Sequence, residues 1–135
     1  MATKAKRILI ADDDRKLLDM LALHLKNAGY EVILAQDSYR ALESARRLSP
    51  DLMVLDVNMP AGDGFSVQER LNKISDVNKM PVIYLTGERS PRVALGSAGF
   101  HASVIYKPFE VDQLLEGVRA ALGETAGGGP LGEAA

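Results

Sequence analysis

The sequence predicts an α/β fold: a doubly wound, five-stranded parallel sheet with helices on both faces. Five short apolar runs are spread along the 135 residues, and helical patterns fill the gaps between them. The runs are apolar almost continuously, which is typical of strands buried on both faces. Strands that alternate with helices form right-handed βαβ crossovers, and these crossovers produce a parallel sheet.

The expected strands are short, rich in β-branched residues, and bounded by charged or turn residues. They lie at residues 7–11, 31–35, 51–55, 81–85 and 102–106. Five βα units of this length suit a flavodoxin-like sheet, whose usual strand order is 2-1-3-4-5.

The expected helices follow from apolar residues at helical spacing. The first covers residues 18–28 and ends at Gly29. The second has Ser38 as its candidate N-cap and stops before Pro50. The other three are expected over residues 67–74, 92–98 and 114–122.

The length predicts one domain. We expect an N-terminal leader at residues 1–6, the domain at 7–123, and a flexible tail or linker stub at 124–135, where glycine is frequent.

Composition excludes several classes of protein. With 16 basic and 18 acidic residues the net charge is -2, so we expect no direct binding of nucleic acid, which needs a basic surface. No apolar stretch reaches the roughly 20 residues of a membrane span, and residues 8–11 are too short for the core of a signal peptide. The chain has no cysteine, which is compatible with a reducing compartment. We therefore expect a cytoplasmic protein without membrane association.

Chemically active side chains come at the ends of four expected strands. In an open parallel sheet, ligands bind beyond the carboxyl ends of the strands. Taken singly, an aspartate in such a position is most often a helix cap or a turn residue. Four strand ends that converge are harder to explain by capping alone. The candidate site residues are Asp12, Asp13, Asp56, Thr86 and Lys107.

The three aspartates predict a cation site. Unit charges roughly 4 Å apart interact by about 4 kcal/mol at an effective dielectric constant of about 20, so the cluster must bind a cation or raise its pKa values. An all-oxygen set of ligands favours a hard divalent ion, Mg²⁺ first or Mn²⁺. Lys107 and the Thr86 hydroxyl would donate to phosphoryl oxygens. The pattern therefore predicts a metal-dependent phosphoryl pocket.

Three blocks of sequence resemble the signature blocks of response-regulator receiver domains. They are residues 8–14, residues 50–60 together with Asp63 and Gly64, and residues 107–109, and the resemblance covers about residues 7–123. The separations between the aspartates, the threonine and the lysine also agree with the family's usual spacing.

The resemblance implies two-component signalling. Asp56 matches the phosphoacceptor, which takes a phosphoryl group from a phosphohistidine on a sensor histidine kinase or a histidine phosphotransfer protein. Thr86 matches the hydroxyl residue that moves to the phosphoryl group, and Lys107 matches the family's lysine. The resemblance implies a switch that signals to an unidentified downstream protein, and slow self-dephosphorylation in place of enzymatic turnover.

The resemblance also implies a set of metal ligands. Asp13 matches a direct ligand of Mg²⁺, and Asp12 matches a carboxylate that acts through water. Asp56 and the backbone carbonyl of Asn58 complete the set.

One position departs from the family pattern. Family members commonly carry Tyr or Phe three residues before the lysine, and here that residue is Val104. Tyr106 is the nearby aromatic residue, and it shares the strand face of Val104 because side chains alternate. The resemblance therefore leaves open how the switch region responds.

Two alternatives remain open. The chain is an interaction module with weak or absent phosphorylation switching, or it is a Mg²⁺ aspartyl-phosphate phosphohydrolase of the haloacid-dehalogenase type. The second family carries its nucleophile after the first strand in an Asp-x-Asp-x-Thr/Val pattern, from which residues 12–16 depart at the last position. No output domain is visible, so a stand-alone regulator and a receiver excised from a longer protein are both open.

Overall fold

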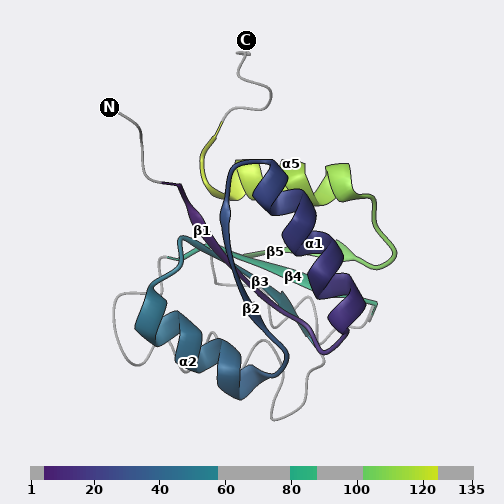
Figure 1. Ribbon diagram of the computed structural model, residues 1–135. Helices are drawn as coiled ribbons and strands as arrows, with labels where there is room; N and C mark the ends of the chain where they lie inside the picture. Colours follow the sequence, from purple (N-terminus) through teal and green to yellow (C-terminus); the bar gives the residue numbers. More distant parts are fainter. Residues whose placement is uncertain (1–4, 58–79, 88–101, 125–135) are drawn as a thin grey trace.

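The computed structural model describes residues 5–57, 80–87 and 102–124 (Figure 1). Within these ranges the chain forms a five-stranded sheet in the order β2-β1-β3-β4-β5, with every neighbouring pair parallel. This confirms the predicted flavodoxin-like topology. The strands are β1 (Arg7–Ala11), β2 (Glu31–Ala35), β3 (Leu52–Asp56), β4 (Val82–Thr86) and β5 (Ala102–Tyr106).

β3 and β4 each begin and end one residue later than predicted. The reason is the hydrogen-bond ladder, which continues past the apolar runs. The Val57 N–H donates to the Leu85 carbonyl at 3.3 Å, and the Lys107 N–H donates to the Thr86 carbonyl at 2.8 Å. Asp56 and Thr86 are therefore the last residues of their strands, held by the ladder itself.

The first helix, α1 (Arg15–Asn27), begins at a side-chain cap. The Asp14 carboxylate accepts a hydrogen bond from the Leu17 N–H at 3.2 Å, which satisfies one of the free donors of the first turn. Beyond the end of the helix Gly29 adopts φ +100°, a conformation that favours glycine, in agreement with the predicted stop.

The second helix, α2 (Ser38–Leu48), corrects one prediction. Its N-cap is Asp37, whose carboxylate accepts from the Arg40 N–H at 2.7 Å, and Ser38 is the first helical residue. Asp and Ser are both good caps, so the local sequence alone does not choose between two adjacent candidates. The helix ends before Pro50, as predicted.

The last described helix is α5 (Val111–Ala121), and Gly123 follows it with φ +73°. The helices predicted over residues 67–74 and 92–98 lie outside the described residues. None of the helices in the described ranges has the length and apolar character needed to cross a membrane.

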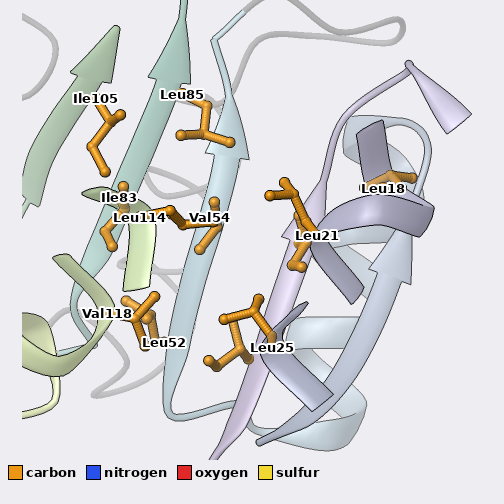
Figure 2. Packing of buried hydrophobic residues seen from close by; sticks show 12 residues of the cluster. Leu18, Leu21, Leu25, Leu52, Val54, Ile83, Leu85, Ile105, Leu114 and Val118 are labelled. Atoms are coloured by element: carbon orange, nitrogen blue, oxygen red, sulfur yellow. The ribbon is translucent and has the colours of Figure 1, made fainter. Parts of the chain in front are cut away.

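Helices cover both faces of the sheet, as predicted (Figure 1). On one face, Ala41 and Ala45 of α2 belong to a buried cluster that also contains Leu55 and Tyr84, and α2 itself contacts β1 and β2. On the other face, α1 and α5 pack against alternate residues of the same strands. Figure 2 shows this second cluster, with side chains from α1, β3, β4, β5 and α5: Leu18, Leu21, Leu25, Leu52, Val54, Ile83, Leu85, Ile105, Leu114 and Val118. The central strands β3 and β4 are buried along their whole length, and because all five strands are parallel, their carboxyl ends lie at one edge of the sheet.

Candidate functional site

The predicted acidic cluster forms at the carboxyl edge of the sheet. Asp12 and Asp13 directly follow β1, and Asp56 ends the neighbouring strand β3. One carboxylate oxygen from each of the three residues lies within 4.8 Å of the others. The cluster lies where the chain order of the strands reverses, between β1 and β3.

The three carboxylates differ in exposure. Asp12 is 1% exposed and Asp56 is 6% exposed, whereas Asp13 is exposed. Oδ1 of Asp12 accepts a hydrogen bond from the Asp14 N–H at 2.9 Å. The site therefore has two buried carboxylates at its base and one at its mouth.

Lys107 supplies the positive charge at the base of the site. Its Nζ donates to Asp12 Oδ2 at 2.9 Å and lies 3.8 Å from Asp56 Oδ1. Burial by itself lowers the pKa of Lys107. The hydrogen bond to Asp12 and the negative charges of Asp12, Asp56 and Asp13 act in the opposite direction and raise the pKa above its usual value. Lys107 therefore stays protonated at neutral pH.

A divalent cation fits this set of donors. Lys107 balances only part of the charge of the three aspartates, so an excess of negative charge remains among these residues. The three acidic groups offer only oxygen, which is the ligand type of hard cations such as Mg²⁺ and Mn²⁺.

Thr86 and Lys107 are joined through the backbone. The Lys107 N–H donates to the Thr86 carbonyl, and Thr86 is fully buried at the end of β4. The structure thus brings together Asp12, Asp13, Asp56, Thr86 and Lys107 at one edge. Asn58, whose carbonyl completes the predicted set of metal ligands, lies outside the described residues.

Tyr84 is a buried residue near the site that no sequence motif singles out. This residue is fully buried, lies two residues before Thr86 on β4, and is in register with Val104 on β5. Its register with Val104 follows from the strand order and not from any local motif.

Comparisons with known proteins agree with this geometry. The family model described as response regulator receiver domain matches residues 8–119. The chain is 37% identical over 121 residues to the DNA-binding dual master transcriptional regulator RpaA of Synechocystis sp., covering 88% of this chain and 50% of RpaA. It is 41% identical over 121 residues to the response regulator MprA of Mycobacterium leprae, covering 88% of this chain and 52% of MprA. The chain thus spans about half the length of these curated relatives.

Solved structures resemble the whole described fold. The chemotaxis protein CheY4 of Vibrio cholerae aligns with a TM-score of 0.81 at 30% identity, covering 88% of this chain and 100% of that one. A CheY-like receiver domain protein of Methanospirillum hungatei aligns with a TM-score of 0.81 at 32% identity, covering 89% of this chain and 95% of that one. The family match, the relatives and the fold agree, and the chain belongs to the response regulator receiver domain family of two-component signalling systems.

Proposed function

We propose that this chain is a phosphoacceptor switch in which Asp56 takes a phosphoryl group from a phosphohistidine of a sensor histidine kinase or a histidine phosphotransfer protein. The observation that carries the proposal is the position of Asp56. This buried carboxylate ends β3 in a cluster with Asp12 and Asp13, 3.8 Å from the Lys107 ammonium.

The transfer is a nucleophilic displacement. An Asp56 carboxylate oxygen attacks the phosphorus atom, the N–P bond of the phosphohistidine breaks, and the imidazole leaves with the bonding electrons. The product is an acyl phosphate on Asp56. Burial of Asp56 near the Lys107 ammonium supports this role, because the positive charge stabilises the negative charge that gathers on the phosphoryl oxygens.

Bound Mg²⁺ or Mn²⁺ would neutralise charge on the phosphoryl oxygens. We assign Asp13, Asp56 and the backbone carbonyl of Asn58 as direct ligands. Both oxygens of Asp12 already accept hydrogen bonds, one from the Asp14 N–H and one from Lys107. This supports a role for Asp12 through water.

Lys107 and Thr86 contact the phosphoryl group after transfer. The Lys107 ammonium bonds Asp12 and lies 3.8 Å from Asp56. A small movement of its flexible side chain therefore carries the ammonium from Asp12 to a phosphoryl oxygen on Asp56. Thr86 ends the strand next to β3, and its hydroxyl donates a hydrogen bond to another phosphoryl oxygen.

We propose that the chain switches a downstream protein and does not turn over a substrate, apart from slow hydrolysis of its own acyl phosphate. A haloacid-dehalogenase-type phosphohydrolase would use an aspartate after β1 as the nucleophile. Asp12 is tied at both oxygens by the Asp14 N–H and Lys107, which favours Asp56 instead.

The partners and boundaries are part of the proposal. Relatives named as DNA-binding regulators are about twice as long as this chain. We therefore assign phosphoacceptance to residues 7–123, with residues 1–6 as a leader and 124–135 as a tail or linker, and we assign no nucleic-acid contact to this chain. A cytoplasmic location without membrane association fits partners that act inside the cell.

The experiment is labelling with acetyl phosphate, and with a phosphohistidine donor, in Mg²⁺ and in excess chelator. We expect one modified residue, Asp56, mapped by mass spectrometry, and labelling only with the metal. A steady release of phosphate from a phosphate monoester would instead support the phosphohydrolase. A folded chain that binds Mg²⁺ but takes no label from either donor would support the interaction module.

A further inference from the structure

Tyr84 occupies a central place in the core beneath the site. Among the fully buried side chains of the described residues, that of Tyr84 is the largest. Thr86 follows two residues later on the same strand, so the two side chains share one face of the sheet. On the same face of β4, Tyr84 is therefore the next residue toward the core from Thr86, whose hydroxyl we propose bonds the phosphoryl group.

The strand register places Tyr84 in a row that crosses the whole sheet on the α2 face. Residues in register on parallel strands share a face. The row consists of Ala35, Ala11, Leu55, Tyr84 and Val104, from β2 to β5. All five belong to, or pack against, one core cluster.

The sizes of the side chains change along this row. Ala35 and Ala11 are small and lie on the strands that α2 contacts. At the other end Tyr84 is in register with Val104, a smaller and only partly buried residue that packs against the same cluster. A close-packed interior accommodates a large ring only where a neighbour leaves room, and extra volume beside it forces strain. Tyr84 and Val104 thus form a pair of complementary size.

The pair adjoins the site through the backbone. Thr86 is in register with Tyr106, and its carbonyl accepts a hydrogen bond from the Lys107 N–H at 2.8 Å. A displacement of Thr86 toward the phosphoryl group therefore acts on β5 through this ladder and on the core through the ring behind it.

We propose that Tyr84 is a positioning residue of the switch: its ring holds Thr86 from behind and relays the state of Thr86 to Val104 on β5. The relay rests on the function proposed above for Thr86. The pairing of ring and valine rests on register and burial alone, so the two parts are tested by different measurements.

The first measurement is a double-mutant cycle on thermal unfolding. Tyr84→Val leaves a cavity, and we expect Tm to fall by roughly 10 °C. Val104→Tyr puts two rings side by side and also lowers Tm. The combined variant moves the ring to β5, so its Tm should exceed that of either single variant. A combined loss equal to the sum of the single losses would overturn the pairing.

The second measurement is the shift of backbone amides on adding beryllofluoride, a phosphoryl mimic, with Mg²⁺. In Tyr84→Val we expect the shifts within residues 102–106 to fall at least twofold, while acetyl phosphate still labels Asp56. Tyr84→Phe keeps the ring and should keep the shifts, and the combined variant should restore them. Leu55→Ala is the matched control: it opens a cavity on the other side of Tyr84 but leaves the pair intact, so the shifts should persist.

The outcomes separate the relay from the proposed function. Undiminished shifts at β5 in Tyr84→Val, recorded well below its Tm, would overturn the relay alone. Loss of the β5 shifts in Leu55→Ala as well would assign them to general destabilisation, which also overturns the relay. An unaltered chain with neither label on Asp56 nor any response would overturn the proposed function and the relay together, whereas the Tm cycle would still decide the pairing.

Discussion

The two ends of the sheet use the same kinds of side chain in different ways. At the amino end, the Arg7 N–H donates to Asp51 Oδ2 at 2.8 Å, and its guanidinium donates to Glu31 at 3.1 Å and to the Leu48 carbonyl at 2.8 Å. The side chains of Arg7 and Glu31 are 33% and 52% exposed. These groups tie β1 to the start of β2 and to the segment that enters β3.

At the carboxyl end, two of the three acidic side chains are buried, and negative charge exceeds positive charge among the candidate site residues. Asp12, Asp13 and Asp56 gather around Lys107, and the cation bonds one of them while it lies near another. An exposed ion pair contributes little to stability because water already solvates it well, whereas buried charges interact strongly. The comparison indicates that burial and an excess of negative charge, and not residue type, distinguish the proposed phosphoacceptor site from the structural contacts at the amino end.

The largest expected effect is the loss of phosphorylation in Asp56→Asn. The amide keeps the shape of the side chain and lacks the nucleophilic oxygen, so labelling by acetyl phosphate should fall to background while the chain stays folded. Asp51→Asn is the matched control at the amino end and should label normally. Strong labelling of Asp56→Asn would move the phosphoacceptor to another residue.

The second prediction compares Lys107 at the carboxyl end with Arg7 at the amino end. Lys107→Met removes the ammonium that bonds Asp12 and lies near Asp56, and we expect a loss of about 1–2 kcal/mol of stability in chelator, reduced from the fully buried case by the partial exposure of the lysine. Saturating Mg²⁺ should recover most of this loss, and Mg²⁺ should bind more tightly because a competing cation is gone. Urea unfolding with and without Mg²⁺ measures both effects.

Arg7→Met supplies the comparison for that experiment. It should lose about 1 kcal/mol through its exposed ion pair and hydrogen bonds, and Mg²⁺ should recover none of it. Equal recovery in the two variants would mean that Mg²⁺ acts on the whole molecule and not at the carboxyl end.

The third prediction separates two adjacent aspartates. Asp13→Asn should weaken Mg²⁺ binding about tenfold or more and raise stability in chelator by about 0.5 kcal/mol, because it removes a ligand and a repulsive charge. Asp14→Ala removes the cap of α1 and should cost about 1 kcal/mol with little change in Mg²⁺ affinity. Titration calorimetry and urea unfolding check the pair, and the reverse pattern would exchange the two roles.

The sequence predicts what depends on pattern and leaves out what depends on tertiary contact. Apolar runs and helical spacing predict the strand order, and that order predicts that Asp12, Asp13 and Asp56 converge. The choice of Asp37 as the cap of α2 depends on which of two capable side chains reaches the Arg40 N–H. The preference of Lys107 for Asp12 depends on where β5 ends relative to β1, which no local motif encodes.

The smallest expected effect concerns Tyr30, which directly precedes β2 at the amino end of the sheet. The Tyr30 hydroxyl donates a hydrogen bond to Glu124 Oε1 at 2.7 Å. Burial, followed by the hydrogen bond to Glu124 and its negative charge, raises the pKa of Tyr30 to about 12. Since an unfolded tyrosine titrates near about 10, the folded chain holds this proton more tightly. The stabilisation is fully present below a pH of about 10 and is lost as the pH rises toward 12.

Tyr30→Phe should therefore lower Tm by about 2 °C at pH 8, a small change because the contact is partly exposed. The difference from the unaltered chain should shrink as the pH rises from 10 to 11. Glu124→Ala should give the same loss at pH 8, and the double variant should lose no more than either single one, because all three remove one contact. Additive losses would mean that Tyr30 and Glu124 stabilise the fold separately, whereas a gap that widens above pH 10 would reverse the sign of the linkage. Ionisation of Tyr30 opposes stability at this contact, whereas we propose that the negative charges of Asp12, Asp13 and Asp56 bind a cation, so the two regions should respond to pH and to Mg²⁺ in different ways.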